Sequence, residues 1–185
     1  MASLLSSGDP TLEQISSYLA TSSDLSFDNS YYFASDYYTG SYNNGIRSFR
    51  VYFWDPTQNP GQKWVQKYSQ TSSQSNFGHQ IACTWDGNRF VVGSPDENKV
   101  YVYHSPGGSG SQLWTHNASG VATSPTAHTI SCPDSGSRRF GWSVAIAKDL
   151  GNHIVIGAPG TGNNGTDTTG LERGKVYIYE FNATT

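Results

Sequence analysis

The chain has 185 residues, of which 14% are charged and 14% aromatic, and its formal net charge is −3. This length suits one domain, and the weakly acidic balance excludes the basic surface that nucleic acid or anionic lipid would require. No apolar run approaches the roughly 18 residues that span a bilayer.

Strands and turns dominate the expected secondary structure, because aromatic residues, Ser, Thr and Gly are abundant. Residues 1–14 are expected to be an N-terminal extension. The first repeat unit covers residues 15–75 and is the most degenerate copy. We expect two strands within 15–36, a third at 48–55 ("SFRVYFWD") and a fourth at 63–70 ("KWVQKYSQ").

The second unit, residues 76–120, begins with "FGHQIACTWDGNRFVVGSPD". Two apolar strands flank a turn in which Gly87 reverses the chain. The segment "KVYVYHS" (99–105) is then the expected third strand. The segment "SQLWTHNAS" (111–119), which contains a Trp as the fourth strand of the first unit does, is the expected fourth strand.

Residues 121–139 are expected to be a linker, and residues 140–185 form the third unit. "FGWSVAIAKDLGNHIVIGAPG" (140–160) repeats the order of the second unit: Phe-Gly, strand, turn, and an apolar strand that ends in Gly-x-Pro. "GKVYIYEF" (174–181) matches the earlier third strand. No fourth strand follows it, so this unit is expected to have three.

This shared order resembles the FG-GAP repeat, the blade unit of the integrin alpha-subunit propeller. The resemblance covers about residues 15–181, and the third unit carries it most specifically. It depends on the V-Y-[VI]-Y strands and on a set of structural residues that define the repeat. That set is Phe77, Gly78, Gly93, Pro95, Phe140, Gly141, Gly157 and Pro159.

The resemblance implies an all-β fold, a partial β-propeller of about three four-stranded antiparallel blades. Both faces of the third strands are apolar, as stacked blades require. Closed propellers have roughly four to eight blades, so about three leave two flanks open. Three arrangements remain open: a piece of a longer propeller, copies that oligomerise into a ring, or a partner that covers the ends.

Many FG-GAP repeats carry a calcium loop with alternating acidic residues between their first two strands. Here each corresponding turn has one carboxylate, Asp86 or Asp149, and the first unit has Asp24 and Asp28 in a looser setting. One carboxylate cannot supply the six or more oxygen ligands of Ca²⁺ without many carbonyls and waters. We therefore expect no metal site and no cofactor.

The sequence gives little support for catalysis. His79 and His153 lack metal-ligand spacing, and Ser143 lies outside a G-x-S-x-G elbow. Cys83 and Cys132 fit no zinc motif, and the spacing leaves a disulfide between them open. The expectation is that the protein is not an enzyme.

Binding by rim loops on a rigid scaffold is the favoured class of function. Tyr37, Tyr38 and Tyr42 are the candidate ligand-binding residues, because they are expected to reach solvent from a loop. Trp64, Trp114 and Trp142 are expected to pack between units instead.

The sequence therefore predicts a non-catalytic module for protein–protein interaction, adhesion or assembly, such as a structural component of a virion. The expected partner is a protein, or the chain itself, covering the open flanks. Two alternatives remain: a carbohydrate-binding lectin-type propeller, or a fragment of a larger extracellular adhesion protein. Extracellular, cell-surface or virion locations fit better than a cytoplasmic enzyme pool.

Overall fold

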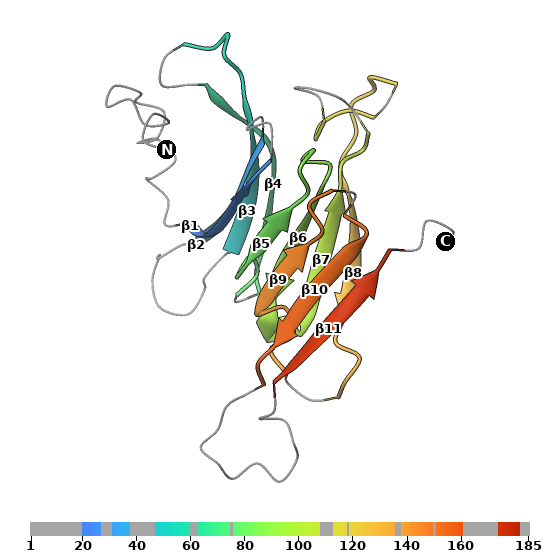
Figure 1. The fold of residues 1–185 in the computed structure, drawn as a ribbon. Helices are drawn as coiled ribbons and strands as arrows, with labels where there is room; N and C mark the ends of the chain where they lie inside the picture. The colour runs from blue at the N-terminus through green and yellow to red at the C-terminus, as the bar shows by residue number, and fades with distance from the viewer. Residues whose placement is uncertain are drawn as a thin grey trace, which may run out of the picture.

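The computed structural model describes residues 20–26, 31–37, 47–59, 63–74, 76–107, 113–117, 119–135, 138–149, 151–160 and 174–181. In this part of the chain the regular elements are three antiparallel sheets and one short 3-10 helix, which confirms the all-β prediction. Figure 1 shows the sheets stacked against one another in chain order. Within the described residues, no helix has the length and apolarity needed to cross a membrane.

Sheet 1 is built from β1 (Ala20–Leu25), β2 (Tyr31–Tyr37), β3 (Arg47–Trp54) and β4 (Trp64–Ser72). Each strand is hydrogen-bonded to the next, so the sheet is a meander of order β1-β2-β3-β4. Phe33 on β2 pairs with Val51 on β3, and both side chains are fully buried. This buried face lies against sheet 2.

Sheet 2 contains β5 (Ile81–Cys83), β6 (Arg89–Ser94), β7 (Lys99–His104) and β8 (Thr126–Ser131), again in sequential order. A 3-10 turn, η1 (Pro95–Glu97), joins β6 to β7. The predicted turn between the two apolar strands is present, with Gly87 at φ +67°. That left-handed conformation favours glycine because it has no Cβ to clash with the backbone.

The fourth strand of sheet 2 differs from the prediction. It is β8, which lies in the segment expected to be a linker, whereas Leu113–Thr115 in the expected strand forms a turn. Trp114 in that turn is 1% exposed, and its Nε1 donates a hydrogen bond to the carbonyl oxygen of Gly87 at 3.0 Å. The tryptophan thus fills the space between sheets 1 and 2.

Sheet 3 has three strands in the described residues: β9 (Ser143–Ile146), β10 (His153–Ala158) and β11 (Lys175–Glu180), in the order β11-β10-β9. The central strand β10 pairs with both neighbours without a register shift. One edge of β11 therefore has no neighbouring strand among the described residues.

Two hydrophobic cores hold the stack together, one on each side of sheet 2. The first, between sheets 1 and 2, is rich in aromatic residues and includes Phe49, Phe90 and Trp114. The second, between sheets 2 and 3, is mainly aliphatic around Phe140. The first three strands of sheet 2 are consequently covered on both faces, whereas its edge strand β8 is largely exposed.

The first strands of the three sheets lie side by side, since β1 contacts β5 and β5 contacts β9 (Figure 1). Asp24 on β1 accepts a hydrogen bond from the backbone N–H of Cys83 on β5 at 2.8 Å. It also forms an ion pair with Lys148, which follows β9. One carboxylate therefore connects all three sheets along this line.

Candidate interaction surface

The two Phe-Gly turns have the same geometry in successive units. Gly78 and Gly141 have φ angles of +81° and +93°, which explains the glycine at both positions. The backbone N–H of Gly78 donates to the carbonyl oxygen of Gly93 at 3.0 Å, and that of Gly141 donates to Gly157 at 3.2 Å. The repeat-defining glycines of the sequence are thus hydrogen-bonded partners in each unit.

The phenylalanines of these turns also occupy equivalent positions. Phe77 lies in the first core and Phe140 in the second. The ring of Phe77 meets that of Tyr101 edge-on at 5.5 Å, and the ring of Phe140 meets that of Tyr177 edge-on at 5.2 Å. Each turn therefore anchors its own unit against the preceding sheet.

The contact between the second Phe-Gly turn, which contains Gly141, and sheet 2 is very close. A Cβ atom on Gly93 would lie 2.0 Å from the carbonyl oxygen of Gly141, and one on Gly141 would lie 2.6 Å from that of Lys99 and 3.1 Å from the backbone nitrogen of Ser94. Backbone therefore packs directly on backbone, and only glycine permits this approach. The acceptor for a Phe-Gly turn is the end of β6 and the start of β7.

Sheet 3 covers an apolar face of sheet 2. The face consists of small and β-branched residues from the first three strands, all at most 9% exposed. They are Ala82, Val91, Val100 and Val102.

The equivalent face of sheet 3 is exposed. Strand pairing shows the equivalence: Val91 opposes Val102 in sheet 2, and Val155 opposes Ile178 in sheet 3. Val176 takes the place of Val100, since each opposes the glycine of its Gly-x-Pro strand end. The exposed fractions are 39% for Val155, 68% for Val176 and 71% for Ile178.

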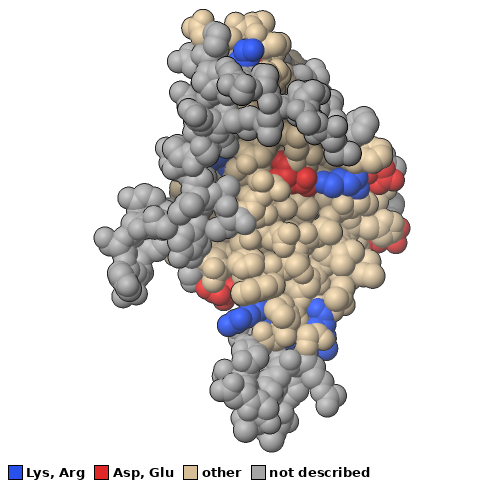
Figure 2. All heavy atoms as spheres, turned by 60° about the vertical axis from the view of Figure 1, so that its left-hand side comes forward, with Lys and Arg blue, Asp and Glu red and all other residues tan. Residues whose placement is uncertain are grey.

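We call the exposed residues Ala145, Val155, Val176 and Ile178 the open face of sheet 3. On the side of the molecule shown in Figure 2, Lys, Arg, Asp and Glu lie toward the margins of a broad area of other residues. An exposed apolar patch of this kind indicates a contact surface. The sequence contains the signal, because these positions match buried ones in sheet 2.

A surface hollow of about 290 Å³ lies at one end of the open face. Its lining includes Gly157, Ala158, Lys175 and Val176. These residues correspond by register to the four residues of sheet 2 that hold the Gly141 turn, namely Gly93, Ser94, Lys99 and Val100. The hollow thus lies at the position in sheet 3 that corresponds to the turn acceptor of sheet 2.

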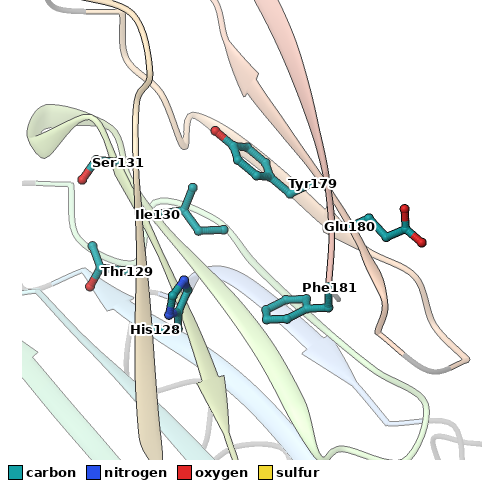
Figure 3. Close-up of a pocket in the computed structure, with 7 residues that line it drawn as sticks. All are labelled: His128, Thr129, Ile130, Ser131, Tyr179, Glu180 and Phe181. Atoms are coloured by element: carbon teal, nitrogen blue, oxygen red, sulfur yellow. The ribbon is translucent and has the colours of Figure 1, made fainter. Parts of the chain in front are cut away.

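A second hollow of about 500 Å³ separates β8 from β11 (Figure 3). Tyr179 and Phe181 point from the β11 side toward Ile130 and His128, while Glu180 points away. The hollow lies beside the outer edge of β11. In sheets 1 and 2, the corresponding edge of the third strand pairs with a fourth strand. An unpaired strand edge of this kind is a recognised site for strand addition.

Both apolar cores are bordered by a Lys-x-Tyr pair and a carboxylate. In sheet 2, Glu97 accepts hydrogen bonds from Tyr101 at 3.1 Å and pairs with Lys99 at 3.5 Å. In sheet 3, Asp134 pairs with Lys175 and accepts a hydrogen bond from Tyr177 at 2.8 Å.

These contacts shift the ionisation of both tyrosines. Burial raises the pKa of Tyr101 to about 12, with a further contribution from the neighbouring Glu97 carboxylate. Burial and the hydrogen bond to Asp134 raise the pKa of Tyr177 in the same way. Both hydroxyls are therefore neutral hydrogen-bond donors at physiological pH.

The residues predicted to bind a ligand cannot be placed in the structure. Tyr38 and Tyr42 lie outside the described residues, as does the side chain of Tyr37. Of the tryptophans, Trp114 packs between sheets as predicted, and Trp142 contacts the preceding unit. The ring of Trp142 lies 4.2 Å from that of His79, although Trp142 is 37% exposed.

The polar residues considered for catalysis have structural contacts. Nδ1 of His79 lies 2.9 Å from the carbonyl oxygen of Trp142, and His153 lies 4.0 Å from Glu180. Ser143 is an exposed strand residue beside Gly157. Both cysteines are free, and burial together with the Asp24 charge raises the pKa of the Cys83 thiol, which disfavours the reactive thiolate.

The turns compared with calcium loops are closed by their own hydrogen bonds. Asp86 accepts bonds from the hydroxyl of Thr84 at 2.7 Å and from the side-chain amide of Asn88 at 2.6 Å. Asp24 lies within strand β1, and Asp28 is outside the described residues. In the described segments, no three His, Cys, Asp or Glu side chains group as metal ligands would.

Comparison with known families identifies one repeat. Residues 134–179 match the FG-GAP repeat, and the match covers β9, β10 and all of β11 except Glu180, together with the segment before them. No curated protein matches the sequence.

The solved structures similar to this chain include a β-propeller domain. The β-propeller domain of Cps50 (Swd1) from Myceliophteria thermophila matches with a TM-score of 0.50 and 14% identity over 92% of this chain and 42% of that one. KlAtg21, in a complex with the coiled-coil of AgAtg16, has a TM-score of 0.48 and 19% identity over 72% and 35% of the two chains. Hsv2 from Kluyvelomyces marxianus has a TM-score of 0.30 and 15% identity over 79% and 34%.

The chain spans less than half the length of each of these structures. The similarity to the Cps50 domain bears on fold alone, and it agrees with the stack of three antiparallel sheets. The predicted resemblance is confirmed over residues 134–179, which match an FG-GAP repeat, and the chain has the fold of part of a β-propeller.

Proposed function

We propose that this protein is a non-catalytic interaction module that binds a protein partner through the open face of sheet 3. The observation that carries the proposal is the difference in exposure between equivalent residues. Val100 is fully buried under the next sheet, whereas Val176, at the same register position, is 68% exposed. A face built like a buried sheet interface has the chemistry to bind another protein surface.

The role that fits such a module is adhesion or assembly, including assembly of a large particle such as a virion. A rigid stack of sheets with an exposed apolar face can add to a neighbouring subunit without rearrangement. The polar side chains considered for catalysis are engaged in strand, turn and interface contacts. These contacts support a structural role for them.

The test is affinity capture of binding proteins from the native source, with the variant Val176→Glu/Ile178→Glu. Two buried carboxylates in the interface would have to be desolvated without a partner, so we expect captured protein to fall at least about ten-fold. The control is Val121→Glu, because Val121 is 59% exposed but lies on the loop before β8. Identical protein profiles from all three baits would contradict the proposal.

A carbohydrate-binding role is the second candidate, supported by exposed tryptophans that could stack on sugar rings. Trp85 is 51% exposed and Trp142 is 37% exposed. This role predicts signals on a glycan array that are lost in Trp85→Ala or Trp142→Ala. A silent array with folded protein would eliminate it.

A further inference from the structure

We infer that the open face of sheet 3 pairs with sheet 1 of a second copy of this chain, in a head-to-tail contact that closes two copies into one six-sheet ring. This inference rests on the proposed function and names its partner. It follows from the fact that one chain carries both halves of the contact that joins its own sheets.

The first half is the acceptor face. In sheet 2, the Val91–Val102 pair is covered by the next sheet, and in sheet 3 the same pair is Val155–Ile178. Ile178 is 71% exposed, although Val102 is fully buried. The acceptor of sheet 3 is thus intact and has no covering sheet among the described residues.

The second half is the covering face. The neighbouring pair in the β6–β7 ladder is Phe90–Tyr103, which packs against Phe33 and Phe49 of sheet 1. In sheet 3 the corresponding pair is Ile154 with Tyr179, on the side of sheet 2.

Sheet 1 has this covering pair too, as Tyr32 with Tyr52. Their rings lie 6.3 Å apart, and the ring of Tyr32 lies 5.9 Å from that of Trp64. These residues are partly exposed on the side of sheet 1 away from sheet 2, where the described residues contain no further sheet. Sheet 1 therefore presents an aromatic covering face of the type that sheet 2 uses, at the same register position as the Ile154–Tyr179 pair of sheet 3.

The two halves are at opposite ends of the stack, so the contact between copies is heterologous and has to close or polymerise. Two copies supply six sheets, a number within the roughly four to eight of closed propellers. Closure by two copies satisfies both exposed faces of each chain, and we therefore expect a dimer.

The test uses the full chain and its mass in solution. We expect light scattering after size exclusion to give twice the 20.1 kDa chain mass for the wild type. Ile178→Glu removes only the acceptor and Tyr52→Asp only the covering face, so each variant alone is expected to be monomeric. Val121→Glu is expected to remain dimeric, and circular dichroism confirms that every variant is folded.

Mixing the two monomeric variants separates a head-to-tail contact from other modes of pairing. The Ile178→Glu chain retains its sheet 1 face and the Tyr52→Asp chain retains its sheet 3 face, so the mixture is expected to form a one-to-one dimer with one intact contact. Three results would overturn the inference. They are a mixture that stays monomeric, dimers formed by each variant alone, and a wild type that is monomeric at about 100 µM, well above the micromolar range typical of weak complexes. Should the wild type be monomeric while Val176→Glu/Ile178→Glu still abolishes capture of a different protein, the inference fails and the proposed function stands.

Discussion

Gly93 and Gly157 hold the same register position in neighbouring sheets, but their surroundings differ. A Cβ on Gly93 would meet the backbone oxygen of Gly141 at 2.0 Å, whereas one on Gly157 would meet the side-chain oxygen of Ser143 at 2.2 Å. A backbone atom between two packed sheets cannot move aside, but an exposed serine can change its rotamer. Sheet packing thus requires glycine at position 93 but not at position 157.

This difference predicts unequal effects of two identical substitutions. Gly93→Ala should lower the free energy of unfolding by about 1–3 kcal/mol, because overpacking forces sheets 2 and 3 apart. Gly157→Ala should cost less than about 1 kcal/mol, because Ser143 can rotate away. Urea denaturation at low protein concentration measures both, and equal losses would show that the interface is not as close as described.

At the scale of elements, Asp24 connects β1 to β5 and to the turn after β9. Burial of the carboxyl group alone raises its pKa, but the hydrogen bonds from Lys148 and from the backbone of Cys83 and Leu25 outweigh burial and lower the pKa below its ordinary value. The folded state therefore favours the ionised form. Its contribution to stability is complete above the unfolded pKa of about 4 and is lost as the pH falls through the lower folded value.

Asp24→Asn should therefore reduce stability in a pH-dependent way. Near pH 7 we expect a loss of about 1–2 kcal/mol, since a charged hydrogen-bond acceptor is replaced by a neutral one. Toward about pH 3, below the unfolded pKa of about 4, the unfolded wild type binds a proton before the folded state does, so the difference between the two proteins should shrink. Urea midpoints at both values measure this, with Glu180→Gln as the control at an exposed carboxylate. A constant difference would mean that the Asp24 charge is not involved.

The elements that the sequence predicts well are those with a strong apolar pattern. The strands that contain Val91, Val155 and their tyrosine-bearing partners were identifiable from alternation and from the Phe-Gly and Gly-x-Pro punctuation. Strand β8 was missed because it is polar and largely exposed, so its sequence resembles a linker. Trp114 was assigned to a strand, although a buried tryptophan also fits a turn between sheets. The Asp24–Lys148 pair joins residues far apart in sequence, and no local pattern predicts it.

At the scale of the whole molecule, the described residues form a stack with one sheet covered on both faces and two terminal ones. Val100 and Val176 lie in strands with the same alternation of side chains. This pattern predicts an apolar face on each strand, but it does not predict which face is covered by another sheet. That information depends on the number of sheets on either side, which only the assembled fold supplies. The sequence therefore predicts that a stack of about three sheets has open apolar flanks. The structure was needed to identify the residues that form the exposed surface.

The repetition of the same register in successive sheets has a consequence for how such proteins can change size. Each interface uses the same few strand positions, so a gain or loss of one unit keeps this geometry and requires only that the facing side chains match. Molecules of different length can then arise by simple modular gain or loss, and their circumference is decided by how many modules meet, whichever polypeptide contributes them.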